Sequence, residues 1–216
     1  MDQLFRQFFQ YDSLTCIVVN GKVLRLAEHK PAVEAHHDTP QEHIMVKAIT
    51  NDEHHNVQHD QHSATASSPP NEDAKEALAI QNNERKLHGC PPLVWDSKLS
   101  EDALGWAIHL ASIEKMVHST GDQRPGEGEN LFSGWQSGGP YKNPLRSGAQ
   151  AWINEKKDYH GEKIGEGDFE KYGHYTQCVW KKTTRVGMAQ ALGKNGWVYV
   201  VGRYSPAGNF VGQKPY

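Results

Sequence analysis

Four ionisable side chains in the second half of the chain belong to the types that bind metal ions or transfer protons. They are His118, Glu129, Glu155 and His174. Two imidazoles and two carboxylates can hold zinc, or they can divide the roles of general acid and general base. No spacing rule joins the four, because they come from separate predicted elements. From the residues alone, four independently hydrogen-bonded polar side chains are the simpler interpretation.

Two predicted helices lead to the first of these residues. Asn71 caps a first helix, and a second begins with Asp96 or Ser97 as its cap. The apolar residues of the second helix recur at helical spacing. We place His118 at the end of this second helical run. Glu129 then follows in "EGENLF", just after a glycine-rich loop.

A third helix and a hairpin complete the predicted elements. Asn143 precedes a proline at the first helical position, and Glu155 shares a helix face with Trp152 and Tyr159. Residues 185–204 contain two β-like runs around "GKNG", which is typical of an antiparallel hairpin. Helices first and strands last predict an α+β domain with an antiparallel sheet between helices.

Composition divides the chain near residue 70. All six tryptophans lie after residue 90, whereas eight of the 13 histidines lie between residues 29 and 62. We therefore expect a largely disordered extension, 1–70, followed by a folded domain, 71–216. Within the extension we expect a β-hairpin near residues 14–26, around "NG", and a histidine-rich linker over 29–70.

Charge and cysteine content limit the classes of partner and compartment. Residues 71–216 carry 18 basic and 17 acidic side chains, so the domain lacks the clustered positive charge that nucleic acid requires. No apolar run is long enough to cross a membrane. The three cysteines are widely spaced, which argues against a disulfide framework. With no signal-peptide pattern and Asp2 after the first methionine, we expect an intracellular protein without a myristoyl anchor.

Five ordered motifs carry a family resemblance over roughly residues 74–212. They are "NERKLHGCPPLVWDSKL", "GENLF", "AWINEKKDY", "GHYTQCVW" and "YVVGRYSPAGN". The last two resemble the two signatures of the CAP superfamily, which comprises cysteine-rich secretory proteins, antigen 5 and pathogenesis-related 1. The few cysteines and the "RYSPAGN" ending look most like the Golgi-associated plant pathogenesis-related proteins.

The resemblance implies an α-β-α sandwich with a central antiparallel sheet and a shallow cavity. In the family the cavity is lined by two histidines and two glutamates, which match His118, Glu129, Glu155 and His174 here. It implies that His118 and His174 hold a divalent metal such as zinc, weakly, because two protein ligands alone give little affinity. One departure is Gln81, which stands where the family often has histidine; it leaves the first helix in place but would alter how that helix caps the cavity.

The resemblance also implies a non-catalytic role. We expect a protein that binds lipid, sterol or a membrane surface, that binds protein partners and that self-associates as a homodimer. We expect it to lie in the cytoplasm or peripherally on Golgi and other membranes, or outside the cell after unconventional secretion. The basic segment and an aromatic loop are the expected contact residues: Lys181, Lys182, Arg185 and Trp135.

Two alternatives belong to other functional classes. The first is a metal-dependent hydrolase or protease, in which zinc activates water and Glu129 or Glu155 acts as the base. The chain has no HExxH motif, which argues against it. The second is a scaffold protein that acts through residues 1–70.

Overall fold

The computed structural model describes residues 9–11, 14–19, 22–25 and 67–216. Three short strands precede the domain: β1 (Phe9–Tyr11), β2 (Leu14–Val19) and β3 (Lys22–Arg25). They pair antiparallel in the order β1-β2-β3, with Val19 opposite Lys22. The two turn residues of the expected hairpin and most of the histidine-rich linker lie outside the described residues.

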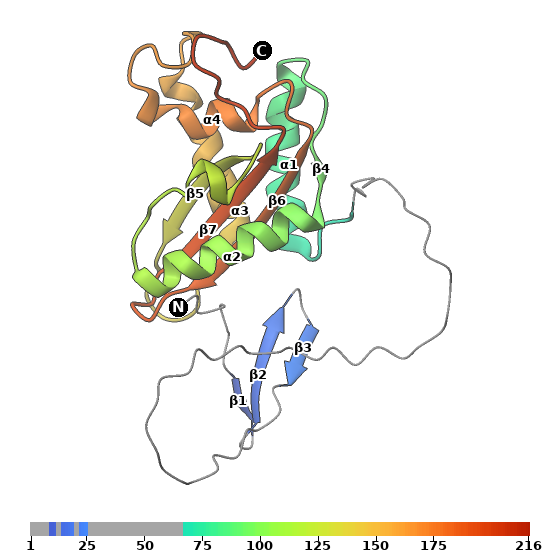
Figure 1. Ribbon diagram of the computed structural model, residues 1–216, viewed down its shortest axis with the longest axis vertical. Coiled ribbons are helices and arrows are strands. Elements are labelled where there is room, and N and C mark those ends of the chain that lie inside the picture. The colour runs from blue at the N-terminus through green and yellow to red at the C-terminus, as the bar shows by residue number, and fades with distance from the viewer. Residues whose placement is uncertain (1–8, 12–13, 20–21, 26–66) are drawn as a thin grey trace, which may run out of the picture.

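The domain contains four α-helices and four strands (Figure 1). In chain order they are α1 (Glu72–Leu87), β4 (Val94–Trp95), α2 (Ser97–Ile113), β5 (Gly128–Gly134), α3 (Pro144–Asn154), α4 (Gly173–Cys178), β6 (Arg185–Leu192) and β7 (Val198–Ser205). Among the described residues, no helix has the length and apolar character needed to cross a bilayer.

The four strands of the domain form one mixed sheet in the order β4-β6-β7-β5. The predicted hairpin is present as β6 and β7, and β5 pairs antiparallel with β7. The predicted antiparallel sheet is confirmed for β5, β6 and β7, and the two-residue strand β4 adds a parallel neighbour to β6. A parallel neighbour needs a crossover, and α2 lies in the chain segment that connects the two strands.

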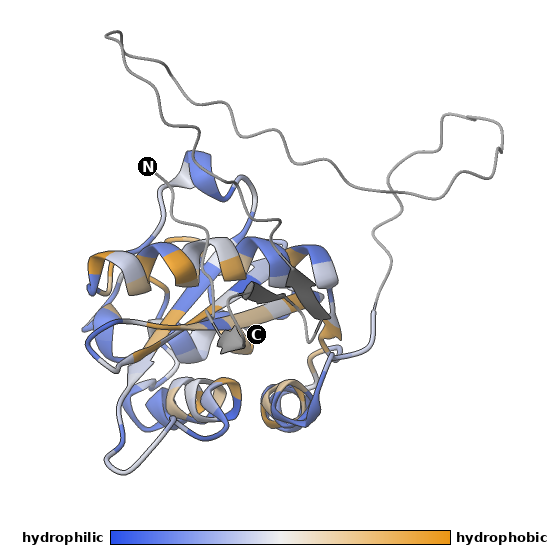
Figure 2. Ribbon diagram, turned by 90° about the horizontal axis from the view of Figure 1, so that it is seen from below, coloured by the Kyte–Doolittle hydropathy of each residue, from blue (hydrophilic) through white to orange (hydrophobic). Residues whose placement is uncertain are grey.

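Helices cover both faces of the sheet, which makes the α-β-α sandwich expected from the resemblance (Figure 2). On one face, α1 and α3 pack over a core that includes Trp95, Trp152 and Tyr204. On the other face, α2 packs over Val201 and neighbouring residues of β6 and β7. Burial of these apolar side chains is the main force that holds the three layers together.

Two predicted helix starts are confirmed, and one is formed differently. The Asn71 side chain accepts from the amide of Ala74 at 2.9 Å, and the Asp96 side chain accepts from Leu99 at 3.1 Å. Asn143 precedes α3 but makes no capping bond with its side chain.

The amides at the start of α3 are instead bound by an acid from another helix. The carboxylate of Asp73, in the first turn of α1, accepts from Leu145 at 3.0 Å and from Arg146 at 2.9 Å. These bonds satisfy helix-terminal donors that otherwise lack partners. They also fix α3 against the start of α1, so this cap depends on tertiary structure.

The second helix ends earlier than predicted. Its last residue is Ile113, and Glu114 turns the chain in the left-handed conformation with φ of 54°. No glycine or proline marks this end in the sequence. Helical spacing alone therefore predicted a helix that continues to His118. As a result, His118 lies in the loop after α2 and not on the helix.

Arg85 links α1 to two later segments of the chain. Its side chain is fully buried and donates hydrogen bonds of 2.7–2.9 Å to four backbone carbonyls, those of Pro91, Cys178, Trp180 and Thr183. Burial lowers the pKa of the Arg85 guanidinium, while nearby thiols and a tyrosine act in the opposite direction. The acceptors include carbonyls at and after the end of α4, where helices leave such groups unpaired.

Gly187 sets the distance between α2 and the sheet. A Cβ atom at this position would lie 2.2 Å from the amide nitrogen of Ser100 and 2.7 Å from the carbonyl oxygen of Asp96. Both are backbone atoms at the start of α2, so no side-chain rotation could relieve the clash. Only glycine permits this close approach.

We predict opposite effects from two glycine substitutions. Gly187→Ala should lower the free energy of unfolding by at least about 2 kcal/mol, because α2 must move away from β6. Gly105→Ala, on the exposed side of α2 with open space around it, should raise that free energy by up to about 1 kcal/mol. Urea denaturation of both variants measures the difference. A Gly187→Ala chain as stable as the unmodified chain would contradict the close contact.

Candidate functional site

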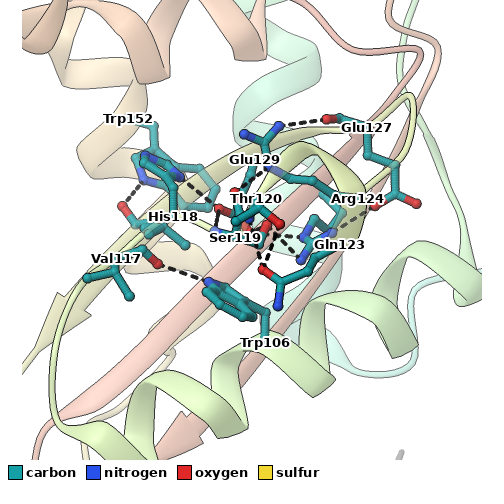
Figure 3. A network of polar contacts seen from close by, with 12 residues as sticks. Trp106, Val117, His118, Ser119, Thr120, Gln123, Arg124, Glu127, Glu129 and Trp152 are labelled. Atoms are coloured by element: carbon teal, nitrogen blue, oxygen red, sulfur yellow. Dashed lines mark hydrogen bonds and ion pairs between the residues drawn. The ribbon is translucent and has the colours of Figure 1, made fainter.

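The first half of the candidate site joins His118 to the buried carboxylate of Glu129. The His118 Nδ1 and Glu129 Oε1 atoms are 2.7 Å apart. Ser119 binds the same carboxylate twice, with its amide at 3.0 Å and its hydroxyl at 2.8 Å. Figure 3 shows these contacts converging on Glu129, which lies on β5.

A buried arginine balances the charge of Glu129. Arg203 on β7 lies directly opposite Glu129 in the sheet, and its Nε is 3.1 Å from Glu129 Oε2. It also donates to Glu127 at 3.0 Å and to the Ser119 hydroxyl at 3.2 Å. Burial by itself would raise the pKa of Glu129, but hydrogen bonds from His118 and Ser119 and the charge of Arg203 together lower it. Glu129 is therefore a fixed anion at neutral pH.

Side chains from α2 and the following turn hold the loop that carries His118. The indole of Trp106 on α2 donates to the carbonyl of Val117 at 3.0 Å. Arg124 donates to the carbonyls of Ser119 and Glu127 at 3.1 and 2.9 Å (Figure 3). These bonds hold the loop on both sides of His118 and so fix its position within the protein.

The second half of the site joins His174 to Glu155. The His174 Nδ1 and Glu155 Oε1 atoms are 2.6 Å apart. The other oxygen of Glu155 accepts the amides of His174 at 3.0 Å and Tyr175 at 3.2 Å. Glu155 thus caps the start of α4, where a negative charge is favoured by the helix dipole. The Trp152 ring stacks on His174 with centroids 6.3 Å apart.

Glu155 does not lie on the helix that was predicted for it. The helix α3 ends at Asn154, and Glu155 begins a short 3-10 helix, Glu155–Asp158. The expected shared helix face with Trp152 and Tyr159 was therefore wrong. From this short 3-10 helix the Glu155 carboxylate reaches the amides at the start of α4.

Both histidines face one cavity of about 460 Å³. Its lining residues are His118, Glu129, Asn130, Phe169, Glu170, Gly173, His174 and Asn209. The structure thus brings three of the four predicted residues to the cavity surface, and the fourth, Glu155, contacts His174 there.

The pairing determines which nitrogen each imidazole can offer to a ligand. Both carboxylates bind Nδ1, which fixes the proton on that atom when the ring is neutral and leaves the Nε2 lone pair for a ligand. Carboxylate–histidine pairs of this kind orient the ring and make it a better metal ligand. Within the described part of the chain, no group of three or more histidine, cysteine or acidic side chains could jointly hold a metal.

Sequence reasoning missed the residues that support Glu129. Ser119 and Arg203 complete its hydrogen bonds and its charge balance, yet neither belongs to the predicted set. A signal was present for Arg203, which stands in the otherwise apolar strand "VYVVGRYS". A charged residue in such a strand indicates a buried acidic partner.

Gln81 does not approach the cavity, contrary to the expectation. Its side chain is fully buried, accepts from Tyr204 at 2.8 Å and donates to the carbonyl of Ala77 at 3.3 Å. Cys178 packs in the same core, 3.4 Å from the Tyr204 hydroxyl. Cys90 and Cys178 are both free thiols.

The four expected contact residues do not come together. Lys181 and Lys182 precede β6 at the end of the sheet where Arg185 pairs with Ser205. Trp135 follows Gly134, which pairs with Val198 at the opposite end. Seven residue steps along β6 separate the two ends by roughly 23 Å. The two groups therefore lie at opposite ends of the sheet.

The fold and the paired histidines define the class to which the chain belongs. Residues 78–204 match the family model described as "CAP: Cysteine-rich secretory protein family", and the chain belongs to this family.

Plant pathogenesis-related proteins of type 1 are similar over most of their length. "Pathogenesis-related leaf protein 4" of Solanum lycopersicum is 34% identical over 158 residues, which are 72% of this chain and 88% of that protein. "Pathogenesis-related protein PR-1" of Medicago truncatula is 37% identical over 140 residues, which are 64% and 76%. The resemblance to the CAP superfamily is confirmed, whereas the Golgi-associated subgroup stays a prediction.

Solved structures give the same fold. The crystal structure of NaASP2 with Zn2+ has a TM-score of 0.58 and 26% identity, over 66% of this chain and 83% of that one. The structure of BmVAL-1 has a TM-score of 0.57 and 24% identity, over 67% and 81%. The second likeness shows the fold alone.

We predict that Glu129→Gln lowers the free energy of unfolding by about 3 kcal/mol at pH 7, because it leaves the buried Arg203 short of a counter-charge. Since folding lowers the pKa of Glu129 below its ordinary value of 4.5, the carboxylate stabilises the fold above that value. This contribution is lost as the pH falls through the lower pKa of the folded protein. The deficit of the variant should therefore shrink in strong acid.

Urea denaturation of both chains between pH 7 and acid tests this prediction. Glu170→Gln is the matched control, because Glu170 lines the same cavity but is exposed. A constant difference between Glu129→Gln and the unmodified chain at every pH would contradict the assigned role of the charge.

Proposed function

We propose that this protein is a non-catalytic CAP module that binds lipid or membrane surfaces. We propose further that its cavity holds a divalent metal, with zinc as the preferred ion. One observation carries the metal part: His118 and His174 are each held at Nδ1 by a carboxylate and face a single cavity. Two imidazoles fixed in this way are suited to bind one cation through Nε2.

The residues fit zinc, but only as an open and weak site. Zinc takes four ligands, and the two histidines supply two nitrogens. The oxygens of Glu129 are occupied by His118, Ser119 and Arg203, and those of Glu155 by His174 and the start of α4. The remaining ligands would come from water or from a bound molecule. The similar protein NaASP2 was crystallised with Zn2+, which supports this choice of metal.

The same contacts argue against the hydrolase alternative. A general base needs a free lone pair and a pKa near the working pH. Glu129 has a lowered pKa and accepts hydrogen bonds on both oxygens. Glu155 likewise binds His174 with one oxygen and the amides at the start of α4 with the other. Both carboxylates are positioned to orient imidazoles, which favours binding over turnover.

The open metal positions favour a ligand with an anionic group. A carboxylate or a phosphate would complete the zinc coordination and neutralise its charge. Phe169 and Gly173 add apolar contacts beside the histidines. An amphiphile such as a fatty acid or a phospholipid has both features. Protein partners, self-association, a Golgi-peripheral location and unconventional export remain predictions.

We predict that zinc affinity depends on the two histidines and on the carboxylates that orient them. His118→Ala and His174→Ala should each abolish the cavity site, whereas Glu155→Gln should weaken it by about tenfold or more while both ligands remain. Isothermal titration of the full chain with zinc measures the number of sites and their affinities. The histidines at residues 29–62 give a background, so the lost site is identified by comparison between variants.

The matched control is His160→Ala, which removes an exposed histidine outside the cavity lining. It should leave the cavity site unchanged. Equal titration curves for His160→Ala, His174→Ala and the unmodified chain would refute a metal site in the cavity.

A further inference from the structure

One end of the sheet carries a group of exposed apolar side chains. The members are Ile113, Trp135, Leu192 and Trp197, whose exposed fractions are 37%, 56%, 45% and 43%. We name this surface the tryptophan pole. Two tryptophans exposed to this degree are unusual for a surface with no partner, because the indole ring is costly to leave in water.

Contacts between three chain segments assemble the pole. Trp135, after β5, lies over Gly196 in the β6–β7 turn, with its indole nitrogen 3.6 Å from the position of a Cβ there. The amide of Asn195 in that turn donates to Glu114, at the end of α2, at 2.8 Å. The ends of α2, β5 and the hairpin lie together in Figure 1. The pole is therefore part of the folded domain.

The three chain segments that form the pole carry mostly positive charges. Residues 113–117, 134–143 and 192–198 contain three lysines, all exposed: Lys115, Lys142 and Lys194. Their only acidic residue is Glu114, which accepts the hydrogen bond from Asn195. The whole chain has a formal net charge of −3, so this local excess of positive charge runs against the average.

We propose that the tryptophan pole is the surface through which this protein docks on anionic lipid bilayers. Indole rings favour the boundary between headgroups and acyl chains, and lysines extend their ammonium groups to lipid phosphates. Each lysine near an anionic surface adds about 1 kcal/mol of attraction. This inference rests on the proposed lipid function and names its membrane-contacting surface.

The opposite end of the domain fits an anionic surface less well. It exposes Phe210 and Val211 and includes Lys181 and Lys182. However, Val211 packs beside Gly165, and residues 162–171 around that glycine carry four exposed or half-buried acids against two exposed lysines, Lys163 and Lys171. These carboxylates would repel lipid phosphates. Trp180, at this end, is buried and cannot insert.

The test is co-sedimentation of the full chain with vesicles of phosphatidylcholine alone and of phosphatidylcholine mixed with phosphatidylserine. Trp135→Ala combined with Trp197→Ala should lower the partition coefficient on mixed vesicles roughly tenfold or more. Lys142→Glu combined with Lys194→Glu should lower it at least as much, since each reversal replaces attraction by repulsion.

Two control variants change the opposite end in the same way. Lys181→Glu with Lys182→Glu makes an equal charge change, and Phe210→Ala removes an aromatic ring that is 51% exposed. Both controls should keep the partition coefficient within about threefold of the unmodified chain, because the affected charges lie beyond a Debye length from the bilayer. Thermal unfolding of each variant confirms that the fold is retained.

The inference is overturned if the unmodified chain does not bind mixed vesicles, as would follow if a protein partner or residues 1–66 cover the pole. It is also overturned if the pole variants bind like the unmodified chain, or if the controls lose as much binding. Zinc titration of the same variants separates the two proposals. If a pole variant loses vesicle binding but still binds zinc in the cavity, the change concerns the pole alone. If the unmodified chain has no zinc site in the cavity, only the metal proposal is refuted.

Discussion

The interaction on which the rest of the structure depends is the buried guanidinium of Arg85. It bridges α1 to the carbonyls that end α4 and to the residues that lead into β6. Its hydrogen-bond acceptors within residues 67–216 are carbonyl dipoles and no carboxylate, and these dipoles must stay in place to avoid an unsolvated cation. Because α4 carries His174, the position of this candidate ligand follows from a residue that is absent from the cavity lining.

Acidic side chains from neighbouring elements accept hydrogen bonds from helix-start amides that have no local capping partner. Asp73 of α1 binds the first amides of α3, and Glu155 binds those of α4. Each cap links two elements, so secondary and tertiary structure form together. In Glu155 the same carboxylate also fixes the imidazole of His174. Folding of the short helix α4 and orientation of a candidate metal ligand are therefore one event.

Helix caps and turns that depend on residues close in the sequence could be predicted. Strand pairing and site contacts that depend on residues far apart in the sequence could not. The caps at Asn71 and Asp96 and the β6–β7 hairpin follow local rules and were found. The strand β4 has two residues and no periodicity, and β5 lies in a glycine-rich stretch, so both were missed. Residue type drew attention to His118, Glu129, Glu155 and His174, but only the family resemblance placed them in one site. Their assembly depends on distant partners such as Arg203, which spacing rules do not include.

The strand register has a consequence for how the two proposed surfaces could operate together. Glu129 lies five residues along β5 from Gly134, where the tryptophan pole begins, so roughly 17 Å separates cavity and pole. A chain docked by the pole would hold its histidines above the headgroups, open to the aqueous phase. The cavity could then receive a lipid only after it had left that bilayer, or from a second membrane facing the first. In this arrangement the bilayer that anchors the pole and the source that supplies the cavity would be two different phases or membranes.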